Sequence, residues 1–300
     1  MVISNELICI APTGDWCGEG VIWHPEEKAV FWVDNRRNLV HRFLVEDQST
    51  RTWLFDETVA ALALTVDPGV LCVVLGSRLI LWSPATDERL PFGGSLEGWP
   101  QVRLNEAGVD PRGFLWLGSM GNNLYPDGTR REVPKSDGSL FQLDREGALS
   151  RKVGGIGVAN TIAWSPDREN FYSADSLENE VRVYQYDLEK GGIHSPRPFF
   201  KGFPRGLPDG SAIDSEGSLW NCRYGGGCIV RVSDRGEIQA IVESPALNVT
   251  SCAFGGAGLD TLYVTSAISD ASPRSRFDGG LFAVRPGVCG YADNARRMRL

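Results

Sequence analysis

The sequence predicts an all-β chain folded as a six-bladed β-propeller, with a single domain over residues 1–300. Composition is the first observation, because 35 glycines and 17 prolines indicate many turns. A turn-and-strand pattern also recurs six times at blade-sized intervals of 41 to 55 residues. Finally, the first strand candidate and the last hairpin each lack a partner, which suits a ring closed by the two ends of the chain.

Each copy of the repeat has an apolar residue, a short polar segment that often contains proline, a tight turn and a β-rich strand. The copies begin at Trp23, Val66, Val109, Trp164, Ile213 and Phe254. Asp-Pro-x-Gly and Ser-Pro-Asp favour tight turns, whereas Val, Phe, Trp and Tyr favour strands. Each copy therefore predicts an inner hairpin, and the runs between copies, such as LVHRFLVED (39–47) and VRVYQYD (181–187), supply the outer hairpins.

The two ends of the chain predict how the ring closes. The last hairpin starts near Gly279 and leaves its blade short of strands, while ELICIAP (6–12) is a strand candidate without a partner. We expect the N-terminal strand to complete the last blade and remove its exposed edge. A β-solenoid or two stacked sandwiches also contain many short strands, but six copies at this spacing favour the closed ring.

Charge and cysteine content exclude several classes of function. The net charge of −8, the pI near 5.1 and the absence of Lys/Arg runs longer than two argue against a nucleic-acid partner. Seven scattered cysteines without a CxxC pair indicate reduced thiols and a cytoplasmic protein. The N-terminus lacks a secretory signal, and no apolar run approaches the ~18 residues of a membrane span. We expect a monomer or small homo-oligomer that binds no membrane.

Residues at one offset from each repeat start share one height around the central channel of a propeller. Four residues before each start, the chain carries Glu19, Leu62, Asn105, Asn160, Asp209 and Thr250. Two carboxylates and amide oxygens on one axis repel unless a cation lies between them, and oxygen ligands favour Ca²⁺, Mg²⁺ or Mn²⁺. We predict that Glu19, Asn160 and Asp209 bind one divalent metal ion, with Asn105 beside it.

Simpler explanations exist for individual members of this set. Asp209 in Pro-Asp-Gly is by itself typical of a turn, and Asn160 before a strand is typical of an amide that satisfies the backbone. The shared offset favours a site, and Glu19 adds to it because GEG has no turn or capping need for a long acid. By the two-residue strand period, Arg103 points toward the same mouth, where it is either solvated or bound to a polar ligand.

The remaining motifs indicate no other chemistry. No GxSxG or GxxxxGK[ST] occurs, and the three histidines (His24, His41 and His194) share no offset, so we expect them in turns or at the surface. The basic clusters Arg130-Arg131 and RRMRL (296–300) are expected to be solvated. Residues 120–138 form an insertion rich in Gly, Pro, Asn and charge, which predicts either a plain surface loop or a lid over the mouth.

Five motifs in order, GEGVIW, RLNEAGVDPRGFLWLGSM, GVANTIAWSPD, GLPDGSAIDSEGSLW and VTSCAFGG with LDTLYVTSA, resemble the SMP-30/gluconolactonase/regucalcin-like family over nearly the whole chain. The resemblance implies a six-bladed propeller with one divalent metal ion in the axial channel, and usually hydrolysis of sugar lactones. In the family, the glutamate of GEG, the asparagine of NxxAWSPD and the aspartate of LPDG bind the metal. They match Glu19, Asn160 and Asp209.

The resemblance also implies substrate residues. The arginine and asparagine of the family's RxND motif match Arg103 and Asn105, whereas Glu106 stands where aspartate is usual. Several sugar-specific members place an acid shortly after the methionine of a GTM motif, to hold a sugar hydroxyl. Here Asn123 occupies that place after Met120, which implies a departure from the usual substrate range. Related propellers of the paraoxonase type carry two calcium ions and catalytic histidines, which this histidine-poor chain does not suggest.

These observations predict a metal-dependent hydrolase of carbohydrate metabolism that opens aldonolactones, such as xylono-, arabinono- or gluconolactone, to the sugar acid. The ion, Ca²⁺ or one of Zn²⁺, Mn²⁺, Mg²⁺ and Fe²⁺, would polarise the lactone carbonyl, and Asp209 would accept the proton of the attacking water. Arg103, Asn105 and Asn123 would orient the substrate. The alternatives are a non-catalytic calcium-binding regulatory propeller, a metal-free interaction scaffold, and a metal-dependent arylesterase or phosphotriesterase.

Overall fold

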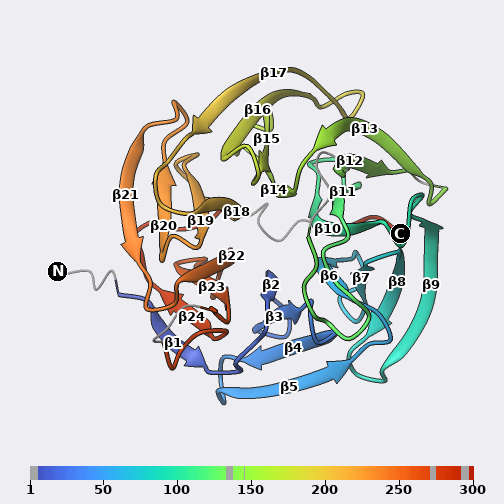
Figure 1. Cartoon of the computed structure of the whole chain (residues 1–300), viewed down its shortest axis with the longest axis horizontal. Helices are drawn as coiled ribbons and strands as arrows, with labels where there is room; N and C mark the ends of the chain where they lie inside the picture. The colour runs from blue at the N-terminus through green and yellow to red at the C-terminus, as the bar shows by residue number, and fades with distance from the viewer. Residues whose placement is uncertain (1–5, 133–137, 145, 271–274, 292–296) are drawn as a thin grey trace.

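Six sheets stand around a central axis like the blades of a propeller (Figure 1). The computed structural model describes residues 6–132, 138–144, 146–270, 275–291 and 297–300. Within these residues, 24 strands form six four-stranded antiparallel sheets. The predicted six-bladed β-propeller is confirmed.

The strands run outward from the axis in sequence order within blades 1 to 5, whereas the outermost strand of blade 6 is the first strand of the chain. Blades 1 and 2 contain β2 (Gly18–His24), β3 (Ala29–Asp34), β4 (Leu39–Leu44), β5 (Ser49–Leu54), β6 (Val59–Leu64), β7 (Leu71–Leu75), β8 (Arg78–Ser83) and β9 (Glu88–Ser95). Blades 3 and 4 contain β10 (Val102–Val109), β11 (Leu115–Gly121), β12 (Gly138–Leu143), β13 (Leu149–Ile156), β14 (Ala159–Trp164), β15 (Asn170–Asp175), β16 (Glu180–Asp187) and β17 (Gly192–Lys201). Blades 5 and 6 contain β18 (Leu207–Ile213), β19 (Leu219–Tyr224), β20 (Cys228–Val232), β21 (Ile238–Glu243), β22 (Asn248–Gly255), β23 (Thr261–Ala267), β24 (Leu281–Val284) and β1 (Ile8–Ala11).

The N-terminal strand β1 completes blade 6, as the sequence predicted. It pairs antiparallel with β24, with Ile8 opposite Ala283 and Cys9 opposite Phe282. This pairing covers the edge that β24 would otherwise expose.

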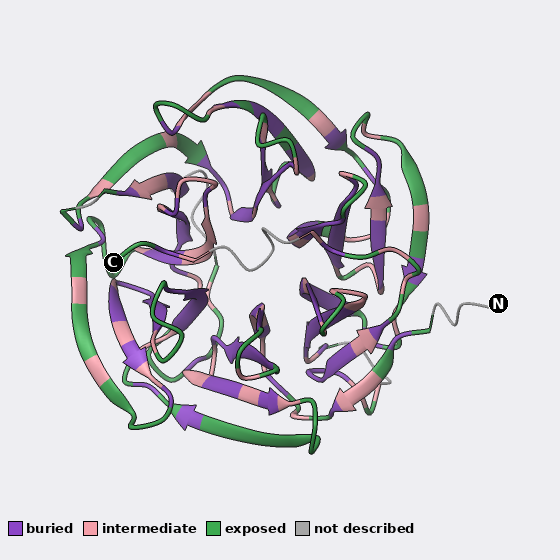
Figure 2. Cartoon of the chain, turned by 180° about the vertical axis from the view of Figure 1, so that it is seen from behind, coloured by how far each residue is buried: buried purple, intermediate pink, exposed green. Residues whose placement is uncertain are grey.

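Burial follows the position of a strand within its blade (Figure 2). The six residues of β3 are all buried, whereas five of the six residues of the outermost strand β5 are exposed. Neighbouring blades pack face to face, and the layer between blades 1 and 2 is built around Trp82, whose ring lies 5.0 Å from that of Trp53 and 5.4 Å from that of Phe55. Inner strands are therefore covered on both faces, which explains their continuous apolar runs.

Every innermost strand has a break in its pairing register near its first residues. The breaks fall between Glu19 and Ile22, Val59 and Ala61, Leu104 and Glu106, Asn160 and Ala163, Pro208 and Ser211, and Val249 and Cys252. A β-bulge disrupts the alternation of side chains and bends the strand, and such bulges are common beside active sites. The ring predicted from the repeat offset therefore coincides with a ring of bulges.

The channel has two different ends. We call the end where the innermost strands begin the upper mouth, and the end where they turn into the second strand of each blade the lower mouth. The described C-terminal residues contact the lower mouth at separate blades: Gly290 pairs with Asp214, Met298 pairs with Thr65, and the Tyr291 hydroxyl donates a hydrogen bond to the Trp164 carbonyl at 2.7 Å. Met298 is 1% exposed, so it packs as a core residue.

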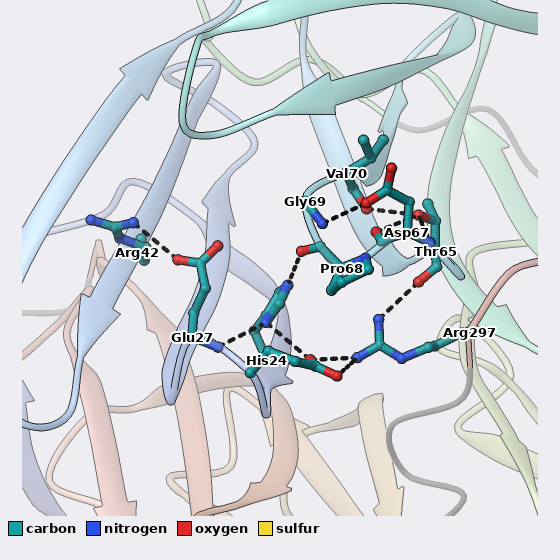
Figure 3. Close-up of polar contacts among 10 residues, drawn as sticks. His24, Glu27, Arg42, Thr65, Asp67, Pro68, Gly69, Val70 and Arg297 are labelled. Atoms are coloured by element: carbon teal, nitrogen blue, oxygen red, sulfur yellow. Dashed lines mark hydrogen bonds and ion pairs between the residues drawn. The ribbon is translucent and has the colours of Figure 1, made fainter.

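Two predictions about surface residues are wrong at the lower mouth (Figure 3). The final basic cluster was expected to be solvated; Arg299 is exposed, but Arg297 donates a hydrogen bond to the Thr65 carbonyl at 2.9 Å and pairs with Glu26, while Arg296 lies outside the described residues. His24 was expected in a turn or at the surface, but it is buried, and its Nε2 lies 3.0 Å from the Pro68 carbonyl oxygen. His41 is also buried, with Nδ1 2.8 Å from the Thr52 hydroxyl.

Across the stretches that the structure describes, no helix has the length and apolar character needed to cross a membrane. All seven cysteines are free.

Candidate metal centre at the upper mouth

Three carboxylates meet at the upper mouth: Glu19 on β2, Glu106 on β10 and Asp209 on β18. Burial raises the pKa of Glu19 well above its ordinary value, and the negative charges of Asp209 and Glu106 raise it further. Burial and the charge of Glu106 likewise raise the pKa of Asp209, which is 5% exposed. Because neighbouring negative charges disfavour ionisation of Glu19 and of Asp209, this end of the channel attracts positive charge.

Glu106 is a member of this cluster that sequence reasoning missed as a site residue. Its carboxylate accepts a hydrogen bond from the Ala107 amide at 3.0 Å, and it lines an axial cavity of about 70 Å³ together with Ser211 and Ser251. Burial raises its pKa to about 7. Strand alternation would put Glu106 and Asn105 on opposite faces, but the register break between Leu104 and Glu106 removes that alternation. The only sequence signal for a role of Glu106 was that it stands where the family usually has an aspartate.

Asn160 on β14 lies between blades and is held from two sides. Its Nδ2 donates to the Ser176 hydroxyl at 2.9 Å, and its Oδ1 accepts a hydrogen bond from Asn105 Nδ2 at 2.9 Å. Ser176 in turn donates to the Pro208 carbonyl, next to Asp209, at 2.6 Å. An amide oxygen has two lone pairs, so Asn160 Oδ1 keeps one acceptor position for a further partner.

The residue after Asn160 is strained in a way that ties β14 to β18. Thr161 has φ of 53°, an unusual conformation for a β-branched residue that costs about 1–3 kcal/mol. Its hydroxyl donates to the Asp209 carbonyl at 2.6 Å and lies 2.8 Å from the Ser211 hydroxyl. These contacts fix the backbone of Asp209 relative to Asn160, and such local strain is common at functional sites.

The residues predicted to contact substrate form one hydrogen-bonded chain with Asn160. Arg103 is 3% exposed; its Nε donates to Asn123 Oδ1 at 3.0 Å and its Nη1 to Asn105 Oδ1 at 2.8 Å. Burial lowers the pKa of Arg103 to about 10, which leaves it cationic at neutral pH. Arg103 is therefore a buried cation at this mouth, bonded to two side-chain amides, and not the solvated residue of the alternative reading.

The long insertion in blade 3 lies over the upper mouth. In its described part, the Gly128 carbonyl accepts a hydrogen bond from Arg36 Nε of blade 1 at 2.9 Å, and Arg130 Nη2 donates to the Tyr224 hydroxyl of blade 5 at 2.7 Å. Residues 133–137 of the insertion lie outside the described residues. The segment 122–132 therefore bridges three blades, and Arg130 is engaged at the mouth and only partly solvated.

The donor chemistry fits a hard divalent cation. Within the described ranges, no group of three or more His, Cys, Asp or Glu side chains is arranged to hold a metal ion. A cation here would depend on a mixed set, the carboxylates of Glu19 and Asp209 with the amide oxygen of Asn160. Oxygen-only donors of this kind suit Ca²⁺, Mg²⁺ or Mn²⁺, and the mutual repulsion of the carboxylates would be relieved by the ion. The predicted ligand set is thus chemically compatible with a metal.

Comparison with known proteins gives consistent likenesses. The chain is 34% identical to the pentonolactonase XacC of Haloferax volcanii, with 84% of this chain and 82% of that protein covered. It is 30% identical to a 6-deoxy-6-sulfogluconolactonase of Pseudomonas putida, with 97% and 98% covered.

Two solved structures share the fold over almost the full length. A luciferin-regenerating enzyme superimposes with a TM-score of 0.85 at 30% identity, covering 98% of this chain and 99% of the other. Regucalcin from Agrobacterium tumefaciens strain C58, described as a calcium-binding protein, superimposes with a TM-score of 0.86 at 24% identity, covering 97% and 96%.

A family model agrees with these likenesses. The model described as SMP-30/Gluconolactonase/LRE-like region matches residues 17–268, which include the three carboxylates, Asn160 and the insertion. The chain therefore belongs to the SMP-30/gluconolactonase/LRE-like family.

Proposed function

We propose that this protein is a metal-dependent sugar lactonase that opens aldonolactones to the corresponding sugar acids. The observation that carries the proposal is the cluster of Glu19, Glu106 and Asp209, whose pKa values are raised by burial beside the Asn160 amide. Membership of a family that includes gluconolactonases supports the enzyme class, and the two relatives named for lactone substrates support the reaction.

Glu19, Asn160 and Asp209 would hold one divalent cation, Ca²⁺ or another ion that accepts oxygen ligands. A bound cation of this kind supplies Lewis acidity toward a lactone carbonyl. The calcium-binding description of the regucalcin neighbour is in keeping with an ion in this fold.

Asp209 is the candidate general base. Its carboxylate would accept a proton from water as the water oxygen bonds to the lactone carbonyl carbon, and the proton would pass to the ring oxygen when the acyl–oxygen bond breaks. Burial and the charge of Glu106 raise the pKa of Asp209 well above its ordinary value, which makes its carboxylate a stronger base. The hydrogen bond from Thr161 to the Asp209 carbonyl would hold the base in place.

Arg103, Asn105 and Asn123 would orient the lactone. Their mutual hydrogen bonds of 2.8 and 3.0 Å place donors and acceptors in fixed directions before substrate arrives, and such preorganisation reduces the entropy lost on binding. Because Asn105 also donates a hydrogen bond to Asn160, a displacement of Arg103, Asn105 or Asn123 would also shift the side chain of this proposed metal ligand.

We also propose a cytoplasmic location and a monomer or small homo-oligomer as the working form. The seven free cysteines, four of them buried, support a reducing compartment.

The test is proton release from D-xylono-, L-arabinono-, D-glucono- and D-galactonolactone, corrected for spontaneous ring opening. Wild-type protein should turn over at least one of them, chelation should abolish turnover, and added metal should restore it. Asp209→Asn should show no turnover above background. Calcium binding without turnover of any lactone would overturn the proposal and favour a regulatory calcium-binding propeller.

A further inference from the structure

One cation at the upper mouth has no role in the mechanism above. Arg130 donates to the Tyr224 hydroxyl at 2.7 Å, and its ion pair with Asp270 is long, 3.8 Å, with an 81% exposed carboxylate. Such an exposed pair contributes little. By contrast, the guanidinium of Arg205 donates two hydrogen bonds, of 2.8 and 2.7 Å, to the carboxylate of Glu243. The Arg130 side chain is 38% exposed, so its guanidinium has donors left for a ligand.

Arg130 lies on the insertion side of the candidate metal centre. Its partner Tyr224 ends β19 and pairs with Leu207, two residues before Asp209. The charges of Asp209 and Arg130 act in opposite directions on the pKa of Tyr224, and those of Glu19 and Arg130 act in opposite directions on the pKa of Cys17. Arg130 is therefore close enough to influence groups beside both predicted ligands, yet it belongs to the segment that bridges the mouth.

The groups around Arg130 suit an anion better than a sugar hydroxyl. Asn123, where the family resemblance implies an acid, accepts a hydrogen bond from Arg103. The nearby acid of the insertion, Asp127, accepts hydrogen bonds from the amide and hydroxyl of Thr129 at 2.9 and 2.7 Å, so its carboxylate is bonded within its own turn. The insertion thus brings a guanidinium to the mouth, and a guanidinium fork matches the oxygens of phosphate, sulfonate or carboxylate.

We propose that Arg130, positioned by Tyr224, binds an anionic group carried by the lactone at the end remote from its carbonyl, so that the preferred substrates are anionic sugar lactones. The inference rests on the proposed lactonase function. The carbonyl would lie at the carboxylate cluster, and a phosphate, sulfonate or carboxylate would reach the guanidinium of the bridging segment.

The first test compares substrates that differ only at C6. D-Glucono-1,5-lactone is the neutral member, and its 6-phospho and 6-deoxy-6-sulfo derivatives carry the anion; a glucarolactone supplies the carboxylate. Wild-type protein should show the higher kcat/KM on at least one anionic lactone. Arg130→Gln should lower the ratio of anionic to neutral kcat/KM about 10- to 100-fold, mainly through KM, because a charge-assisted pair is lost.

Three variants sharpen the result. Arg130→Lys keeps the charge and should retain part of the preference, and Tyr224→Phe, which removes the positioning hydroxyl, should reduce it less than Arg130→Gln does. Arg235→Gln, an exposed arginine on the turn between β20 and β21, is the matched control and should leave the ratio unchanged. A wild-type preference for the neutral lactone, or an unchanged ratio in Arg130→Gln, overturns the inference.

A binding measurement separates this inference from the proposed function. Calorimetric titration with 6-phospho-D-gluconate and D-gluconate requires no turnover. Wild-type protein should bind the phosphorylated acid more tightly, and Arg130→Gln should remove most of that difference. Absence of hydrolysis with all lactones would overturn the lactonase function alone, whereas equal affinities of wild-type protein for both acids would overturn the role of Arg130.

Discussion

The two mouths of the channel are built from the same six strands but hold very different groups. At the upper mouth, burial raises the pKa of Glu19 and of Asp209, and the negative charge of Glu106 raises both further. At the lower mouth, a cavity of about 160 Å³ is lined mainly by apolar and aromatic side chains, including Trp23 and Tyr291. The Tyr291 hydroxyl there is bonded to the Trp164 carbonyl, whereas at the upper mouth the charge of Glu106 opposes ionisation of Glu19 and Asp209. Repulsion between carboxylates, in addition to burial, distinguishes the candidate site.

The largest contrast between the mouths is expected for catalysis. Asp209→Asn should lower kcat/KM on a sugar lactone about 10³-fold, because the proposed general base and one proposed negative metal ligand are lost. Tyr291→Phe, which removes a hydroxyl at the lower mouth, should leave kcat/KM unchanged. Steady-state assays on both variants measure the difference. Equal losses in the two would mean that the chemistry is not confined to the upper mouth.

The second contrast concerns stability, where a substitution at the lower mouth should have the larger effect. Met298 is 1% exposed and packs in the layer between blades 2 and 3, so Met298→Ala should lower the free energy of unfolding by about 2–5 kcal/mol. Its kcat/KM at a temperature well below unfolding should match that of wild-type protein. Urea unfolding followed by tryptophan fluorescence provides the measurement, and an undiminished midpoint would show that the C-terminal segment is dispensable.

Substitution of Glu106 should stabilise the protein, in contrast to substitution of Met298, because the buried Glu106 carboxylate opposes folding at high pH. Its pKa rises from 4.5 to about 7 on folding, so the folded chain binds more protons than the unfolded chain between these values. Stability from this group is present at low pH and is lost as pH rises toward 7. In metal-free protein, Glu106→Gln should therefore raise the free energy of unfolding by up to about 3 kcal/mol at pH 8 and by little at pH 4.5.

Chemical unfolding at the two pH values tests this, with Glu237→Gln on an exposed turn as the control. A destabilised Glu106→Gln at pH 8 would show that burial does not disfavour the ionised Glu106 carboxylate.

The smallest expected effect belongs to the ion pair at the lower mouth. Arg297 and Glu26 have side chains that are 22% and 49% exposed, and such pairs contribute about 1 kcal/mol or less. Arg297→Gln should lower the melting temperature slightly, with a difference that shrinks in high salt, and leave kcat/KM intact. A loss as large as that of Met298→Ala would show that the pair, and not the apolar contact, holds the segment.

Repetition explains why so much of the fold was predictable. Six copies of one hairpin pattern determined the blades, and the lone strand before Gly18 could belong only to the blade that lacked one. Glu19, Asn160 and Asp209 were found because a shared offset in a repeat corresponds to a shared position in space. Their proximity is a consequence of the ring, although their roles remain proposals.

Features that depend on local departures from the repeat were not predictable. Glu106 faces the cluster because of a bulge, and strand alternation gives no hint of it. Arg130 reaches Tyr224, 94 residues away, through an insertion without periodicity. Arg297 and Met298 look like a solvated tail in sequence, yet they pair with Thr65 across the lower mouth. Contacts between segments distant in sequence need the fold before they can be seen.

The pairing of β1 with β24 also has a consequence for how the chain assembles. Ile8 pairs with Ala283, so the sixth sheet encloses almost the whole polypeptide in one loop. During synthesis β1 must wait for the last blade, while blades 1 to 5 can form from neighbouring hairpins with local contacts. Closure is therefore the late step of folding, and until then both edges of an open arc are exposed to other nascent chains. Yield at high expression should depend on how quickly the ribosome delivers the final strand.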